Sequence, residues 1–179
     1  MAKQFNHIPQ NLQDFIEKQH IFFVATAGRD GRVNLSPKGL DSLRVTGENE
    51  VIWLNLTGSG NETAAHLLEV NRMTLMFCSF EKNPLILRLY GQAQILHFDD
   101  AAWSDYAPMF ADDPGMRQIF VMSVDLVQTS CGYAVPFFEF KADRTVLQAW
   151  SKKQGERGIE EYREEKNRVS LDGKPTDLF

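Results

Sequence analysis

A short turn rich in glycine and hydroxyl side chains is the part of the sequence best suited to chemistry. It reads Thr57-Gly58-Ser59-Gly60-Asn61-Glu62-Thr63 and stands between the apolar run 51–56 and a helix-like run that begins at Ala64. Glycines let the backbone approach a ligand closely, hydroxyls donate hydrogen bonds, and a helix start presents unpaired N–H groups at the positive end of its dipole. These properties suit an anion, and phosphate is the anion that we expect. The alternative is an ordinary turn in which Asn61 or Thr63 caps the helix.

A second polar segment, DGRVNLSPKG at residues 30–39, carries hydrogen-bond donors at alternate positions. Asp30-Gly31 lies between two strand-like runs, which is a strong signal for a hairpin. Alternation along the second strand of that hairpin places three polar side chains on one face: Asn34, Ser36 and Lys38. Because Pro37 has no N–H to donate, we expect this strand to lie at an edge of its sheet. The alternative is a solvent-exposed hairpin face that needs no ligand.

The order of these segments resembles the pyridoxamine 5'-phosphate oxidase-like family, the flavin-binding split barrels. The resemblance rests on DGRVNLSPKG, VIWLNL, TGSGNETAAHL, RMTLMFCSF and LILRLYGQAQIL, and it covers about residues 15–98. It implies a mainly β fold, an antiparallel six-stranded split barrel with flanking helices, that forms a homodimer and binds FMN at the subunit interface. The residues that the resemblance assigns to FMN are Ser36, Pro37, Lys38, Thr57, Gly58, Ser59, Gly60, Asn61 and Thr63.

The turn departs from the family because it carries no cation. Many relatives have a lysine or arginine pair just before the helix, whereas this chain has Asn61-Glu62-Thr63. A carboxylate beside a phosphate is repulsive, so we expect Glu62 to point away or to cap the helix. The cation must then come from elsewhere. Lys38 is the first candidate, with Arg44 and Arg88 behind it.

The C-terminal sequence RVSLDGKPTDLF lacks the arginine and histidine signature with which true pyridoxamine phosphate oxidases hold pyridoxal phosphate. We therefore expect an FMN-dependent oxidoreductase that acts on another, unidentified small molecule. The flavin carries the redox chemistry itself, so the lack of an obvious acid–base pair does not argue against an enzyme, and no catalytic residue is assigned. Two alternatives stay open: a non-catalytic flavin-binding or flavin-storage protein, and a split barrel that binds another ligand such as haem.

Composition limits the other partners. The chain has 179 residues, a net charge of −5 and no block rich in lysine and arginine, so no nucleic-acid partner is expected. No apolar run is long enough to span a bilayer, and charges are scattered through the first twenty residues, unlike a signal peptide. We expect a cytoplasmic protein that binds no membrane, with Cys78 and Cys131 as free thiols.

The four histidines have no metal-ligand spacing, so no metal is expected. His66 lies on the apolar side of the helix after the turn, and a packing role suits it better than a catalytic one.

The hydrophobic patterns predict a single domain, residues 1–179, with a helical C-terminal extension from about residue 143 to 179, and the resemblance implies that this domain is a split barrel. Strands are expected at 21–27, 32–37, 42–46, 50–56, 73–80, 85–97 and 119–127, and helices at 9–19 and after Asp99-Asp100. Gly91 predicts a bulge or a sharp bend.

The charged tail predicts two short helices divided by Gly155 and Gly158. For residues 165–179 we expect a solvated helix with a loose end. The alternative, which follows from the resemblance, is an arm that crosses to the partner subunit near the flavin.

Overall fold

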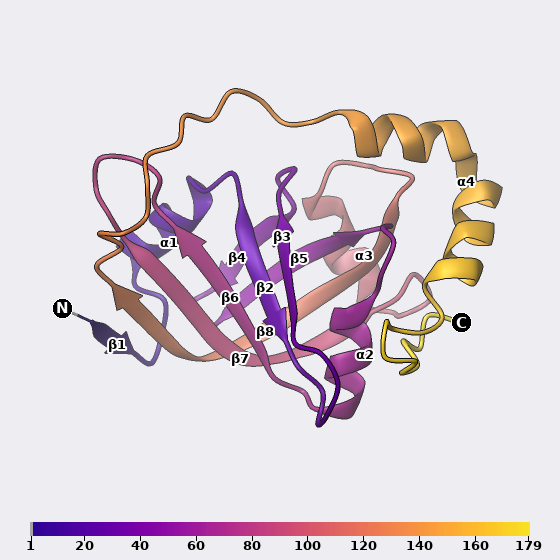
Figure 1. Cartoon of the computed structure of the whole chain (residues 1–179), viewed down its shortest axis with the longest axis horizontal. Coiled ribbons are helices and arrows are strands. Elements are labelled where there is room, and N and C mark those ends of the chain that lie inside the picture. Colours follow the sequence, from indigo (N-terminus) through magenta and orange to yellow (C-terminus); the bar gives the residue numbers. More distant parts are fainter. Residues whose placement is uncertain (1) are drawn as a thin grey trace.

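A computed structural model describes residues 2–179. Within this range eight strands form one antiparallel sheet in the order β3-β2-β6-β7-β8-β5-β4, and β1 pairs with β8 (Figure 1). The strands are β1 (Lys3–Phe5), β2 (Phe22–Thr26), β3 (Asn34–Lys38), β4 (Leu43–Gly47), β5 (Glu50–Leu56), β6 (Met73–Cys78), β7 (Ile86–Leu96) and β8 (Met116–Ser130). The helical elements are α1 (Gln10–Glu17), α2 (Glu62–Glu69), α3 (Trp103–Tyr106), the 3₁₀ turn η1 (Ala107–Met109) and α4 (Val146–Lys166).

The mainly β fold with flanking helices is as predicted, but the six-stranded count is wrong. Strand β8 is long enough to take an additional partner, β1, which lies outside the predicted strand ranges. It pairs with β7 along one side, whereas its other side is shared between β5, from Met116 to Ser123, and the short strand β1, from Val127 to Thr129. The three residues of β1 are too few to show any periodicity, so no local pattern predicts this strand.

Strand β5 is buried on both faces, which explains its continuous apolar run. Val51 and Trp53 belong to the main core cluster, in which the Trp53 and Phe120 rings stack with centroids 4.4 Å apart. Ile52 and Leu54 point the other way, into a second cluster that α3 covers. The end of β5 is therefore held rigidly, and this end leads directly into the glycine turn.

Gly91 forms the predicted bulge. The pairing between β7 and β8 shifts register between Tyr90 and Gly91, and a Cβ at this glycine would lie 1.9 Å from the carbonyl oxygen of Ser123. Only a residue without a side chain fits so close to a neighbouring backbone.

The two ends of the sheet approach each other near β3. This strand lies at the edge of the sheet, as Pro37 predicted, and four strands separate it from β5 in the pairing order. Nevertheless Lys38 Nζ lies 3.5 Å from Asn55 Oδ1 on β5. The sheet therefore curls round on itself, as expected for a split barrel.

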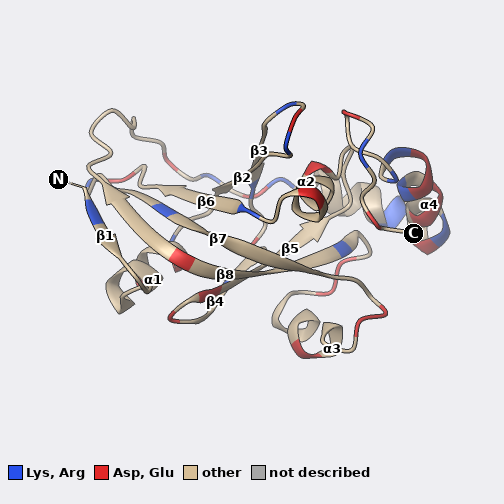
Figure 2. Cartoon of the chain, turned by 90° about the horizontal axis from the view of Figure 1, so that it is seen from below, with Lys and Arg blue, Asp and Glu red and all other residues tan. Residues whose placement is uncertain are grey.

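The C-terminal part differs from the prediction. Gly155 breaks α4 with a φ of 65°, as expected, but Gly158 lies inside the helix, and the helix ends at Lys166 rather than continuing to residue 179. Charges of both signs alternate along α4, which fits its exposed position (Figure 2).

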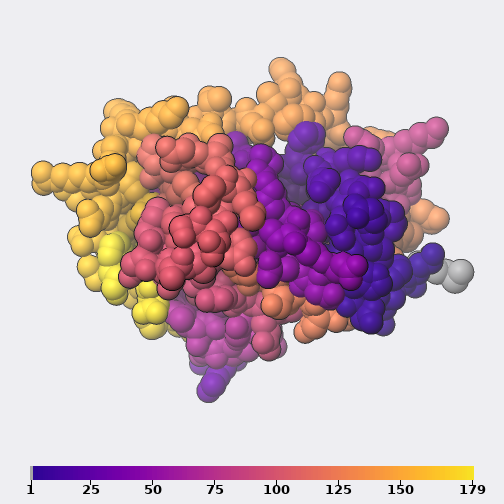
Figure 3. Space-filling model, turned by 180° about the vertical axis from the view of Figure 1, so that it is seen from behind, coloured from indigo at the N-terminus to yellow at the C-terminus, as the bar shows by residue number. Residues whose placement is uncertain are grey.

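The expectation of a loose end at residues 165–179 is wrong. Residues 167–179 fold back as a turn closed by a bridge between Val169 and Pro175, and three of their side chains are buried: Asn167, Ser170 and Thr176. In the view from behind, this C-terminal segment lies against the body of the protein (Figure 3). The helix expected after Asp99-Asp100 begins only at Trp103.

Among residues 2–179, no helix combines the length and the apolar character needed to cross a membrane.

Candidate functional site

Strand β3, the end of β5 and the start of α2 enclose a cavity of about 260 Å³. Seven of the nine residues assigned to a phosphate ligand by sequence line it together: Ser36, Lys38, Gly58, Ser59, Gly60, Asn61 and Thr63. The other two do not. Pro37 is exposed on the opposite face of β3, as strand alternation requires, and Thr57 is fully buried behind the turn. The hairpin and the turn, far apart in the sequence, therefore form one site.

Hydrogen bonds fix β3 against α2. The Asn34 side-chain amide donates to the hydroxyl of Thr26, 3.1 Å away, and to that of Thr63, 3.2 Å away. The Thr26 hydroxyl also lies 3.1 Å from His66 Nδ1. His66 is buried in α2 and outside the cavity lining, which fits the packing role that the sequence favoured.

The turn leaves donors available for a ligand. Asn61 precedes α2, but neither its side chain nor another caps the helix within the described residues. The alternative of an ordinary capped turn is therefore wrong. Asn55 donates to Asn61 Oδ1 over 3.3 Å, which holds the amide of Asn61 at the cavity, while Asn61 Nδ2 is buried with no partner in residues 2–179. Glu62 also lines the cavity, and its carboxylate accepts a hydrogen bond from the backbone N–H of Leu171.

Two cations face this cavity, Lys38 from β3 and Arg117 from β8. Burial, with the nearby charge of Arg117, lowers the pKa of Lys38 to about 8. Burial, with the charge of Arg163, lowers the pKa of Arg117 to about 9. Among the described residues no carboxylate forms an ion pair with either cation, and Arg117 Nε has no hydrogen-bond partner. Desolvated charges of one sign without a counterion are costly, so the cavity is built for an anion.

Of the three cations that the sequence offered, Lys38 lines this cavity, whereas Arg44 and Arg88 do not; Arg117 was not among them. Arg44 is held by Asp41 and the carbonyl of Met109, and Arg88 donates to Ser130 away from the cavity. Arg117 stands two residues before the apolar run 119–122, and a charged side chain at such a place is usually exposed. Its position beside the turn depends on the register of β8 with β5, which no local pattern shows.

The end of α4 and the C-terminal segment hold residues of the site from behind without lining the cavity. Arg163 Nε donates to the Thr57 hydroxyl over 2.9 Å, and Asn167 Nδ2 donates to the Gly58 carbonyl over 2.9 Å. Asn167 Oδ1 accepts from Arg117 Nη1 at 2.6 Å. Polar residues near the C-terminus thus hold in place both the glycine turn and Arg117, which the sequence did not indicate.

Ion pairs attach the same segment to the first hairpin. Asp172 pairs with Arg32, and Lys174 pairs with Asp30 and Glu69. Lys174 Nζ donates hydrogen bonds to the carboxylates of Asp30 and Glu69, and these bonds raise the pKa of Lys174 and lower the pKa of each carboxyl group. The hairpin that carries β3 is thereby tied to the tail.

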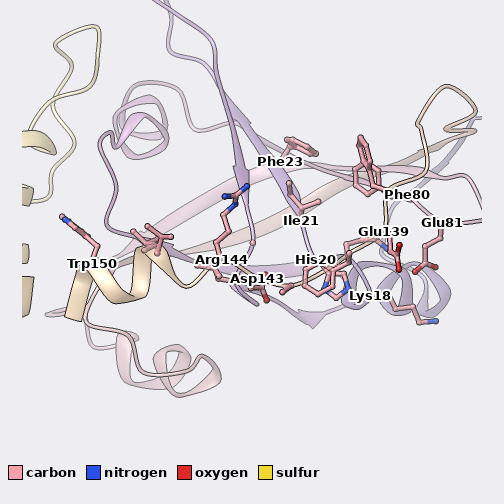
Figure 4. A pocket seen from close by; sticks show the side chains of 18 residues that line it. Lys18, His20, Ile21, Phe23, Phe80, Glu81, Glu139, Asp143, Arg144 and Trp150 are labelled. Atoms are coloured by element: carbon pink, nitrogen blue, oxygen red, sulfur yellow. The ribbon is translucent and has the colours of Figure 1, made fainter. Parts of the chain in front are cut away.

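A second and larger cavity, of about 1000 Å³, lies between the segment 138–150 and the ends of β2 and β6 (Figure 4). Its walls are mainly apolar, with a stacked pair His20–Phe140 and a tilted pair Phe80–Phe138. None of the nine predicted site residues lines it. Gly39 and Leu40, which directly follow Lys38, form part of its wall, so the two cavities are close along β3.

Comparison with known proteins agrees with this architecture. The family model described as pyridoxamine 5'-phosphate oxidase matches residues 8–131. The pyridoxamine 5'-phosphate oxidase family protein ustO of Aspergillus flavus is 33% identical over 189 aligned residues, which cover 96% of this chain and 76% of that protein.

Solved structures share the fold at low sequence identity. The H111A form of HupZ from Group A Streptococcus superposes with a TM-score of 0.56 at 21% identity, over 69% of this chain and 99% of that one. A protein from Mycobacterium smegmatis described as FAD binding gives a TM-score of 0.51 at 12% identity, over 70% and 97%. The matched sequence, the curated relative and the split-barrel fold together show that this chain belongs to the pyridoxamine 5'-phosphate oxidase family.

Proposed function

We propose that this protein binds FMN, with the phosphate in the cavity between β3 and the glycine turn, and acts as an FMN-dependent oxidoreductase on a small molecule. One observation carries the proposal: Lys38 and Arg117 are both desolvated, face one cavity and form no ion pair within the described part of the chain. A phosphate supplies the missing negative charge. It also offers acceptors to Asn61 Nδ2 and Arg117 Nε, the two buried donors without a partner there.

The charge of the cavity favours FMN over other flavins. FMN ends in a phosphate monoester, which is largely dianionic at neutral pH and matches two cations, whereas each phosphate in the pyrophosphate of FAD carries one charge. Riboflavin has no phosphate and would leave both cations unpaired. Family membership and the flavin named for the Mycobacterium smegmatis structure support a flavin in general, and the two cations support FMN in particular.

The size of the cavity supports a second subunit in the site. A volume of about 260 Å³ lies below the usual range for a whole ligand of drug size, so it encloses the phosphate end and leaves the ring system outside. We propose that a second copy of the chain covers the ring in a homodimer.

The outer face of β3 suits such an interface. Val33 and Leu35 are 75% and 64% exposed there, next to a hairpin partner strand whose Phe23 lines the larger cavity. Exposed apolar side chains at alternate positions of an edge strand suit an interaction surface.

When bound, the flavin supplies the two-electron chemistry. The residues of this chain bind and orient it. Lys38 and Arg117 neutralise the phosphate, Asn61 and the turn donate to it, and the hydrogen bonds of Asn34 keep β3 at a fixed distance from α2.

Titration of the purified protein with FMN, FAD and riboflavin tests the proposal. We expect a flavin absorbance spectrum or saturable uptake of one FMN per chain, with FMN bound at least about 100-fold more tightly than riboflavin, because charge-assisted hydrogen bonds are lost with the phosphate. Equal affinity for FMN and riboflavin contradicts the phosphate site. Uptake of haem with no uptake of flavin supports the other ligand class.

Sedimentation equilibrium tests the homodimer, with Leu35→Asp as the variant that places a charge on the proposed interface. We expect a dimer for the unmodified protein, and for the variant a monomer that binds FMN more weakly. An unmodified protein that binds FMN fully as a monomer would rule out the interface.

A further inference from the structure

We infer that Asn167, on the C-terminal segment, is a positioning residue that sets the phosphate specificity of the site, an inference that rests on the proposed FMN function. Asn167 is completely buried and touches both halves of the anion cavity. Its amide nitrogen donates to the Gly58 carbonyl at 2.9 Å, and its oxygen accepts from Arg117 Nη1 at 2.6 Å. One side chain therefore fixes the glycine turn and the buried cation relative to each other.

The choice of an amide at this position has an electrostatic reason. A neutral acceptor holds the guanidinium of Arg117 without cancelling its charge, so the charge stays available to a ligand. A carboxylate of the same size would form an ion pair with Arg117 and place a negative charge beside the phosphate. The amide thus orients the cation while leaving the cavity positive.

The surroundings of Asn167 show that its position is itself fixed. Its backbone N–H donates to the carbonyl of Arg163, and its backbone carbonyl accepts from the hydroxyl of Thr176 at 2.5 Å. Arg163 in turn donates to Thr57, the residue just before Gly58. Asn167 is therefore held against the turn through both its backbone N–H and its backbone carbonyl.

Two substitutions separate positioning from mere structural support. Asn167→Ala removes both hydrogen bonds and leaves Arg117 without this partner. Asn167→Asp keeps an acceptor for Arg117, loses the donor to the Gly58 carbonyl and adds a charge. A purely structural role predicts that the affinity for FMN follows the stability of the folded protein in both variants. The positioning role predicts that Tm and the affinity for FMN rank the two variants in opposite order. Asn167→Asp has the higher Tm, whereas Asn167→Ala has the higher affinity for FMN.

The experiment measures Tm without ligand, and the dissociation constants of FMN and riboflavin, for the full chain and its variants. We expect Asn167→Asp to weaken FMN binding by about 10- to 150-fold, the range for a hydrogen bond to a charged group, and to leave riboflavin binding unchanged. Arg168→Gln is the matched control. It changes the net charge by the same amount one residue away, and Arg168 is exposed, beside Glu164 and Phe179.

The outcomes distinguish the inference from the proposed function. If the unmodified protein prefers FMN over riboflavin and Asn167→Asp keeps that preference, the positioning role is refuted while the FMN site stands. If the unmodified protein shows no preference, the proposed function itself fails. A loss of affinity for FMN and riboflavin alike, in step with Tm, would reduce Asn167 to structural support.

Discussion

Replacing Lys38 by methionine is expected to stabilise the ligand-free protein and to weaken FMN binding. The substitution keeps the length and the apolar stem of the side chain and removes the charge. In the folded protein the pKa of Lys38 falls from 10.5 to about 8, a difference worth about 3 kcal/mol against the protonated form. The free energy of unfolding of Lys38→Met at pH 7 should therefore rise by up to about 3 kcal/mol.

The effect on binding has the opposite sign. The substitution removes one charge-assisted hydrogen bond between the protein and the phosphate, which is worth about 1.5–3 kcal/mol. The dissociation constant of FMN should therefore rise about 10- to 150-fold. That of riboflavin should stay the same, because riboflavin has no phosphate to contact.

Urea unfolding without ligand and fluorescence titration with both flavins measure the two effects. Lys152→Met, on the exposed side of α4, is the matched control and should change neither. A Lys38→Met protein that is less stable without ligand and binds FMN as tightly as the unmodified protein refutes the reasoning. Such a result would mean that Lys38 already has a counterion in its own chain.

Three further predictions follow. FMN binding at pH 8–9 should take up a proton, because the phosphate raises the lowered pKa of Lys38. Calorimetry in buffers of different ionisation enthalpy measures this proton uptake, and Lys38→Met should reduce it. Gly91→Ala should destabilise the fold by about 1–3 kcal/mol or more in urea, because its Cβ meets the Ser123 backbone, whereas Gly47→Ala, whose Cβ has ordinary space, should cost less than about 1 kcal/mol. Lys174→Ala should make Tm fall less steeply below pH 4.5. The carboxyl groups paired with Lys174 have lowered pKa values, so the stability that the ion pairs contribute is fully present above pH 4.5 and is lost as these groups protonate. An unchanged fall of Tm below pH 4.5 would contradict the ion pairs.

Local patterns in the sequence predicted the parts of the site that lie on single elements. Alternation along residues 34–38 placed Ser36 and Lys38 on the cavity face and Pro37 on the other. The glycines and hydroxyls of the turn, followed by a helix, predicted where that helix starts. Gly91 marked the bulge because only a missing side chain permits that backbone approach.

Long-range pairing explains what the sequence did not predict. Arg117 reaches the cavity because β8 pairs with β5, and Asn167 reaches Gly58 across 109 residues of chain. The polar, turn-forming residues of the tail are also typical of exposed chain ends, so composition favoured a loose end. Thr57 was assigned to the ligand, but its hydroxyl is used inside the protein, between the Gly115 carbonyl and Arg163.

The position of the phosphate in a crystal structure with bound FMN tests the central claim most directly. We predict that its oxygens lie within hydrogen-bond distance of Lys38 Nζ, the Arg117 guanidinium and Asn61 Nδ2, with the flavin ring outside the cavity and against a second copy of the chain. A phosphate bound anywhere else, with Lys38 and Arg117 left without an anion, would contradict the account.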